Sequence, residues 1–209
     1  RVPQALEECA STGIRAAIVV TQGFADADEI GKELQENIIE ISERTGLRII
    51  GPNTIGVVNS LAHFTSSFIE VSEDETPVGQ IAQSGFLMMG HHLVTNERAG
   101  FCMSVDLGNA CDISLIDVLE YYEQEENVRV IECHVEAIDD GPAFLETAKR
   151  ITSMKPLVLL KAGNSESGQA AVASHTGAVA GQSKVYDAAF RQAGVIQAKN
   201  AEELRLFSK

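Results

Sequence analysis

The sequence predicts an α/β protein built on parallel, doubly wound sheets. Short apolar runs alternate with amphipathic stretches along the whole chain, and this βαβα order is typical of parallel sheets. The chain is 44% apolar but only 5% aromatic, without Trp. Its apolar residues are mainly Ala, Val, Ile and Leu, which helix-covered parallel sheets prefer. The 209 residues suffice for one large or two small domains.

Each element is predicted from a local pattern. The segment 28–45 is expected to be a helix because Ile30, Leu34, Ile38 and Ile41 share one helical face. Apolar runs predict strands at 16–20, 48–50, from residue 81, and at 101–105, 128–135, 157–161 and 195–196. Amphipathic stretches predict the other helices at 2–8, 86–96, 115–122, 142–151, 185–193 and 202–206.

The alternation breaks at residues 61–77, which are polar and weakly periodic. We interpret them as a linker between a first α/β unit, residues 1–60, and a second unit, residues 78–209. The first unit has too few elements to be complete, and both ends of the chain look cut from a longer polypeptide.

Composition excludes several classes of function. The formal net charge is −14, which disfavours nucleic acids and anionic membranes as partners. The four cysteines, Cys9, Cys102, Cys111 and Cys133, form no C-x-x-C pair and indicate a reduced, cytoplasmic protein without a metal site. No signal peptide is apparent, and no apolar run approaches the ~18 residues that span a bilayer.

Ligands of doubly wound sheets bind beyond the carboxyl ends of the strands. At one such end Ser84 and Gly85 are expected to open a helix, whose free N–H groups and positive dipole end form an anion site. The alternative is an ordinary helix cap without a ligand.

The segment 170–181 consists of small residues around His175. A neutral imidazole is a good nucleophile near pH 7, and small neighbours let it approach phosphates. Glu136, at the end of a predicted strand, could orient the ring and stabilise its cationic form. The alternatives are an incidental surface histidine and a solvated strand end. The other histidines, His63, His91, His92 and His134, are given no role.

In order and spacing, several motifs together resemble the α-type portion of NDP-forming acyl-CoA synthetases, the family of ADP-forming acetyl-CoA synthetase and succinyl-CoA synthetase. They are Gly51-Pro52-Asn53-Thr54-Ile55-Gly56, Gln83-Ser84-Gly85, Gly108-Asn109-Ala110-Cys111-Asp112, and the run from Lys161-Ala162-Gly163 through Ser174-His175-Thr176-Gly177. The resemblance covers nearly the whole chain.

The resemblance implies a truncated Rossmann-like CoA-binding unit followed by a flavodoxin-like ligase domain. It implies that His175 is phosphorylated, with Glu136 as its carboxylate partner. The other implied site residues are Ser84, Gly85, Gly108, Asn109 and Gly177 for phosphate, and Gln22, Gly23, Pro52, Asn53 and Thr54 for CoA. Thr54 stands where the family commonly has Cys, which we interpret as a change in packing near the thioester.

The implied reaction converts acyl-CoA, ADP and phosphate into acid, CoA and ATP through an acyl phosphate and a phosphohistidine. ATP or ADP with Mg²⁺ is expected in an ATP-grasp domain or β subunit outside these residues. We expect an oligomer and, for these 209 residues alone, no net synthesis. The rival hypotheses are a CoA-binding regulatory module without turnover and a flavodoxin-like nucleotide-binding module, which leaves the segment around His175 unexplained.

Overall fold

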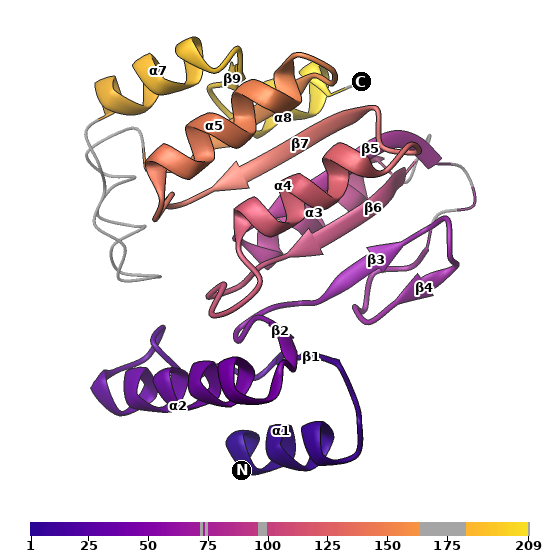
Figure 1. Ribbon diagram of the computed structural model, residues 1–209. Coiled ribbons are helices and arrows are strands. Elements are labelled where there is room, and N and C mark those ends of the chain that lie inside the picture. Colours follow the sequence, from indigo (N-terminus) through magenta and orange to yellow (C-terminus); the bar gives the residue numbers. More distant parts are fainter. Residues whose placement is uncertain (72, 74, 96–99, 164–182, 209) are drawn as a thin grey trace.

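The computed structural model describes residues 1–71, 73, 75–95, 100–163 and 183–208. They form a two-stranded parallel sheet near the amino terminus and a seven-stranded sheet that follows it (Figure 1). The expected sites His175 and Gly177 lie outside the described residues. Within the described ranges, no helix has both the length and the apolar character needed to cross a membrane.

The small unit comprises α1 (Val2–Ser11), β1 (Ala16–Ile18), α2 (Glu29–Thr45) and β2 (Arg48–Ile50). β1 and β2 are parallel, with Ala17 opposite Ile49. Helix α2 begins where the Asp28 carboxylate accepts the Gly31 N–H at 2.8 Å and ends at Gly46, which has a φ of 75°. The core of the unit consists of Leu6, Val19, Phe24, Ile38, Ile41, Leu47 and Ile49.

The apolar face predicted for α2 is only half buried. Ile38 and Ile41 are buried, whereas Ile30 is 70% and Leu34 is 38% exposed. The two strands of this unit are three residues each, and Figure 1 shows the long helix extending well past them. The small sheet therefore covers only the last turns of the helix.

The large sheet contains β3 (Val57–Asn59), β4 (Phe64–Thr65), β5 (Glu75–Ala82), β6 (Gly100–Asp106), β7 (Val130–Val135), β8 (Leu157–Lys161) and β9 (Ile196–Ala198). Their order is β4-β3-β6-β5-β7-β8-β9. The five strands from β5 onward are parallel and follow the flavodoxin-like order 2-1-3-4-5. This confirms the predicted fold class of the second unit.

Helices cover both faces of the large sheet. α4 (Leu115–Gln124), α5 (Gly141–Thr152) and α7 (Ser183–Gln192) pack in one apolar cluster with Ile81, Ile131 and Leu159. α3 (Gly85–Thr95) and α8 (Ala201–Phe207) cover the other face, where Val158 and Leu160 lie. Successive residues of a strand point to opposite faces of the sheet. Because helices cover both faces, the strands are apolar almost throughout.

The segment predicted as a linker, residues 61–77, carries regular structure. It contains β4 and the first residues of β5, which starts at Glu75 rather than at Ile81 as expected. β3 and β4 add an antiparallel edge to the sheet, since β3 pairs antiparallel with both β4 and β6. Strands of two or three residues are too short to show alternation in the sequence. The domain boundaries themselves stay a prediction.

The face under α3 and α8 has a polar layer inside it. The Glu132 carboxylate accepts hydrogen bonds from Gln80 Nε2 at 2.9 Å, His91 Nδ1 at 2.8 Å and Ser208 Oγ at 2.5 Å. These bonds explain how a strand can hold a buried carboxylate. On the same strand, burial lowers the pKa of His134 to about 4, so this ring is neutral at physiological pH.

Candidate functional site

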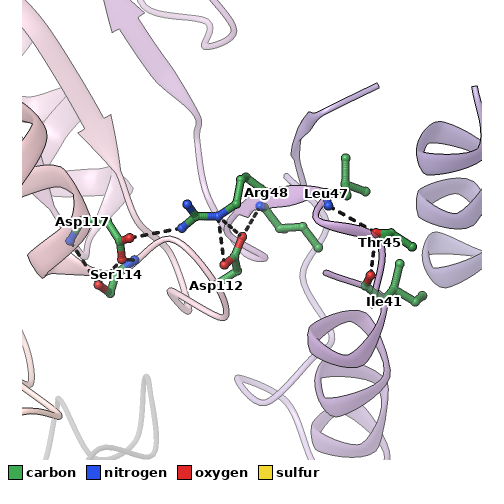
Figure 2. Close-up of polar contacts among 8 residues, drawn as sticks. Ile41, Thr45, Leu47, Arg48, Asp112, Ser114 and Asp117 are labelled. Carbon is green, nitrogen blue, oxygen red and sulfur yellow. Dashed lines mark hydrogen bonds and ion pairs between the residues drawn. The ribbon is translucent and has the colours of Figure 1, made fainter. Parts of the chain in front are cut away.

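The two units are joined by polar contacts with the loop that follows β6 and with the first turn of α4. Arg48 Nε donates to Asp112 at 3.1 and 3.2 Å, and Arg48 Nη2 donates to Asp117 at 3.2 Å (Figure 2). The Ile49 N–H donates to the same Asp112 carboxylate at 2.6 Å, and the Ile113 N–H donates to Ile49 O at 3.1 Å. The loop therefore holds β2 of the small unit beside the carboxyl end of β6.

The switch point of the large sheet lies between β5 and β7, where crossover helices leave toward opposite faces. Gln83, directly after β5, connects the two strand ends. Its Oε1 accepts the N–H groups of Glu136 at 2.5 Å and Ala137 at 3.1 Å, and its own N–H donates to His134 O at 3.1 Å. Gln83 thereby positions Glu136 beside the start of α3.

A cleft of about 420 Å³ opens at this edge of the sheet. Both units contribute to its lining, which consists of Val20, Gln22, Asn53, Thr54, Ile55, Phe68, Gln83, Ser84, Gly85, Phe86, Asp106, Gly108 and Asn109. A smaller cleft of about 220 Å³ adjoins it and shares Gln83, Gly108 and Asn109. Glu136 lines the smaller cleft.

Seven of the residues predicted from the sequence meet in the larger cleft: Gln22, Asn53, Thr54, Ser84, Gly85, Gly108 and Asn109. Gly23 and Pro52 line neither cleft. The Gly23 N–H is used by the Asp26 carboxylate at 3.1 Å, and Pro52 is buried with its carbonyl accepting the Asn109 N–H at 2.9 Å. These two residues shape the loops that carry their neighbours.

Helix α3 starts directly at the cleft. The Ser84 carbonyl accepts the Leu87 and Met88 N–H groups, both at 3.1 Å, so Ser84 immediately precedes the first turn. A Cβ on Gly85 would lie 2.7 Å from Ile55 Cγ2 and 3.0 Å from Asp106 Oδ2. Glycine is therefore required here by the close approach of the small unit and of β6.

Gly108 and Asn109 pack against the loop of the small unit. Gly108 has a φ of 55°, and a Cβ there would lie 2.2 Å from Pro52 O. Asn109 Nδ2 donates to Asp26 Oδ1 and Gln35 Oε1, both at 2.9 Å. Its Oδ1 accepts from Asn53 Nδ2 at 3.3 Å. The Asn109 side chain thus joins the two units across the cleft.

Thr54 is buried where the two units meet. It is 2% exposed, its hydroxyl donates to the Asp106 carbonyl at 2.5 Å, and it accepts the Gly56 N–H at 2.9 Å. A Cβ on Gly51 would lie 2.8 Å from the Thr54 methyl carbon, so this methyl group packs closely against Gly51. These contacts give Thr54 a packing and hydrogen-bonding function in the turn.

Asp106 lines the cleft and was not predicted as a site residue. It is 1% exposed, and its Oδ2 accepts the Ile55 N–H at 2.7 Å. Its Oδ1 is buried without a hydrogen-bond partner in the described part of the chain. Burial is the main reason why the pKa of Asp106 is raised to about 6, and the charge of Glu136 also raises it. The Ile55 and Gly108 N–H groups and the Thr54 hydroxyl act in the opposite direction and lower this pKa. Only its position at a strand end could have indicated it.

Lys161, at the end of β8, is a second residue that the sequence argument gave no role. It is 3% exposed, and its Nζ donates to Ala162 O at 2.7 Å and lies 4.9 Å from the centre of the Tyr186 ring. Burial lowers the pKa of Lys161, whereas the charge of Glu136 raises it. A buried cation therefore acts electrostatically on the strand end that carries Glu136.

The lining of the two clefts contains carboxylates but no cation. Asp26, Glu136 and Asp139 line the smaller cleft, and Asp106 lines the larger one, whereas neither described lining contains Lys or Arg. Of the groups in this lining, the N–H groups at the start of α3 are the ones suited to an anionic ligand.

Comparisons with known protein families and with individual proteins indicate the same family. The family model described as "Succinyl-CoA ligase like flavodoxin domain" matches residues 75–208. The alpha subunit of acetate–CoA ligase (ADP-forming) II from Pyrococcus furiosus is 40% identical over 204 residues, which are 97% of this chain and 44% of that protein. Acetate–CoA ligase (ADP-forming) from Methanocaldococcus jannaschii is 38% identical over 205 residues, 97% of this chain and 29% of that protein.

A solved structure agrees over nearly the whole chain. The dinucleotide-forming acetyl-coenzyme A synthetase 1 of Ca. Korarchaeum cryptofilum, in complex with phosphate and ADP, superimposes with a TM-score of 0.92 at 32% identity. The match covers 98% of this chain and 44% of that one, so the chain spans less than half the length of these relatives. The resemblance to NDP-forming acyl-CoA synthetases is confirmed, and the chain belongs to the family of succinyl-CoA ligase-like flavodoxin domains.

Proposed function

We propose that the chain is the CoA- and phosphate-handling part of an ADP-forming acyl-CoA ligase. The reaction is acyl-CoA + ADP + phosphate ⇌ acid + CoA + ATP. The observation that carries the proposal is the cleft where the start of α3 faces the Asn53–Ile55 turn, in a chain whose relatives are named as CoA ligases. An anion site and a thioester site in one cleft are what phosphorolysis of a thioester requires.

In this proposal, phosphate bound at Ser84 and Gly85 attacks the carbonyl carbon of acyl-CoA. The C–S bond breaks, an acyl phosphate forms, and CoA leaves as its thiol beside Asn53 and Thr54. The N–H groups at the start of α3 stabilise the negative charge on the transferring groups. Gln22, Gly23 and Pro52 belong to the loops that shape the CoA side.

A nitrogen of His175 then takes the phosphoryl group from the acyl phosphate and releases the carboxylic acid. Glu136 orients the imidazole and stabilises the cationic phosphohistidine. Gly108, Asn109 and Gly177 complete the phosphate side. The neighbours of His175 in sequence are small residues, a composition that favours close approach of the ring to phosphates.

ADP collects the phosphoryl group in an ATP-grasp domain or β subunit. Two observations support such a partner: the relatives extend well beyond the matched region, and the described clefts lack a lysine or arginine. Mg²⁺ bound with the nucleotide would supply positive charge to the transferring phosphates. We propose a cytoplasmic oligomer of these parts.

The proposal is tested on the complete enzyme with its nucleotide-binding part, incubated with acyl-CoA, ADP and phosphate. We expect one free thiol for each ATP formed, and no thiol when phosphate is omitted. Thiol release without phosphate would indicate a thioesterase. Binding of CoA without either product would favour the regulatory module, and both results would contradict the proposal.

A further inference from the structure

Asp106 is a buried carboxyl group of which one oxygen is in use. Its Oδ2 accepts the Ile55 N–H at 2.7 Å and lies 3.2 Å from the Thr54 hydroxyl. Its Oδ1 is buried without a hydrogen-bond partner in the described ranges, although the side chain lines the larger cleft. Buried polar atoms normally have a partner, so this oxygen is suited to a partner that enters with a ligand.

The register of the sheet places this carboxyl group between the two sides of the cleft. Asp106 lies opposite Ala82 in the pairing of β5 with β6, and Ala82 belongs to an apolar cluster with Met88 of α3. Side chains of paired residues share a face of the sheet, so Asp106 points toward the face that α3 covers. A Cβ on Gly85 would lie 3.0 Å from Asp106 Oδ2. The carboxyl group therefore adjoins both the start of α3 and the turn at Ile55, which in the proposed function are the phosphate side and the thiol side.

Few groups around Asp106 can exchange a proton near neutral pH. On β7, His134 lies in the same row of the sheet, but burial lowers its pKa to about 4. On α3, His91 and His92 bond to strand residues two positions before this row. Glu136, at the end of β7, raises the pKa of Asp106 through its negative charge. The cleft wall next to Asp106 consists of residues without an ionisable side chain, namely Asn53, Thr54, Ile55, Ser84, Gly85, Gly108 and Asn109.

Phosphorolysis of a thioester needs a proton donor at sulfur. A thiol has an ordinary pKa of about 8.5, so CoA is released at neutral pH as the thiol. Resting on the proposed function, we propose that Asp106 is the catalytic acid that protonates the sulfur of CoA as the C–S bond breaks, and the base that takes this proton from the thiol during acyl-CoA synthesis. The proton lies on Oδ1, because Oδ2 is the acceptor of the Ile55 N–H.

The step balances without a proton from outside. A phosphate oxygen forms the bond to the acyl carbon, the sulfur takes both electrons of the C–S bond, and the proton of Asp106 passes to the sulfur. Hydrogen phosphate brings a proton of its own, which remains on the acyl phosphate. The acyl group withdraws electrons and makes this O–H more acidic, so its proton passes to the Asp106 carboxylate. Asp106 thereby ends each turnover in its starting state.

Separate assays of the two halves of the reaction test this assignment in the complete enzyme. The first measures ATP formed from acetyl-CoA, phosphate and ADP, which requires cleavage of the thioester. The second measures ATP formed from acetyl phosphate and ADP, which bypasses that cleavage. We expect Asp106→Asn to lower the first rate by about a hundred- to ten-thousandfold, the contribution of general acid catalysis, and to leave the second within about threefold of the parent. The amide fits the same space, so the variant should fold, which its melting temperature verifies.

The pH dependence separates proton transfer from a structural effect. The catalytic acid must be protonated when sulfur leaves, so the rate of the parent relative to Asp106→Asn in the first assay should fall as pH rises through the pKa of Asp106. This pKa is about 6, and a phosphate anion bound nearby raises it further. Phosphate titrates equally in both assays and cancels in the ratio. A ratio that does not change with pH would contradict the inference.

Asp187→Asn is the matched control. Asp187 lies on α7, lines neither cleft and accepts from Gln197 Nε2 at 2.8 Å, and its substitution removes the same charge. We expect both rates of this variant to stay within about twofold of the parent.

Two further outcomes would overturn the inference. Cleavage of acetyl-CoA by Asp106→Asn within about threefold of the parent would remove Asp106 from the chemistry. Equal losses in the two assays would assign it to phosphate binding or to the joint between the units. A parent enzyme that forms no ATP from acetyl phosphate or from any acyl-CoA would instead contradict the proposed function itself.

Discussion

Replacing Glu136 by glutamine is expected to slow phosphorylation of the enzyme and overall turnover by roughly ten- to a thousandfold. The amide keeps the shape of the side chain but removes the charge that, in the proposed function, orients His175 and stabilises its cationic phosphorylated form. The backbone at Glu136 is held by Gln83, independently of the carboxylate. The fold should therefore survive, and phosphate-dependent ATP formation measures the loss.

Glu146→Gln provides the control for this change. Glu146 is exposed on α5, the helix that follows β7, and the substitution alters the net charge of the protein equally. We expect its turnover to stay within about twofold of the parent, as for most surface substitutions. Equal rates for Glu136→Gln and the parent would remove Glu136 from the mechanism.

Replacing Asp106 by asparagine is expected to stabilise the folded protein at neutral pH. The pKa of Asp106 is raised from 3.8 to about 6, mainly by burial. Between these values the folded state binds more protons than the unfolded state, so the contribution of Asp106 to stability falls as pH rises through this window. Above pH 6 the charged carboxylate destabilises the fold by about 3 kcal/mol, and asparagine removes this charge.

Urea unfolding of both proteins between pH 4 and pH 7.5 measures this effect. The two should be about equally stable near pH 4, where the protonated carboxyl resembles the amide. The variant should gain about 3 kcal/mol by pH 7. His92 and His134, whose pKa values burial lowers to about 4, titrate in both proteins and cancel. A difference that does not change with pH would show that Asp106 is not destabilised by its burial.

The main elements could be predicted because their patterns are local. The strand 157–161 is apolar at its first four positions, and β8 spans the same residues. The apolar spacing predicts a helix over 28–45, and α2 spans Glu29–Thr45 with Asp28 as its N-cap. The exposure of Ile30 and Leu34 could not be predicted, because periodicity says which residues share a face and not whether another element covers that face.

The edge strands and the buried polar groups depend on distant contacts. β3 and β4 are too short for any periodic signal, and they exist because β6 offers an edge to pair with. The position of the candidate site could be predicted, because the carboxyl ends of parallel strands meet at one edge of the sheet. Asp106 and Lys161 were missed because their burial, which perturbs their pKa values, is created by neighbouring loops and strands rather than by adjacent residues.

In the proposed function phosphate passes through His175, and labelling of the protein tests this step most directly. The complete enzyme is incubated with γ-labelled ATP and separated from nucleotide. We predict a phosphoprotein that is labile in acid and stable in base, as a phosphoramidate requires, and we predict no label and no turnover in the folded His175→Ala variant. Label that persists in His175→Ala would contradict the account.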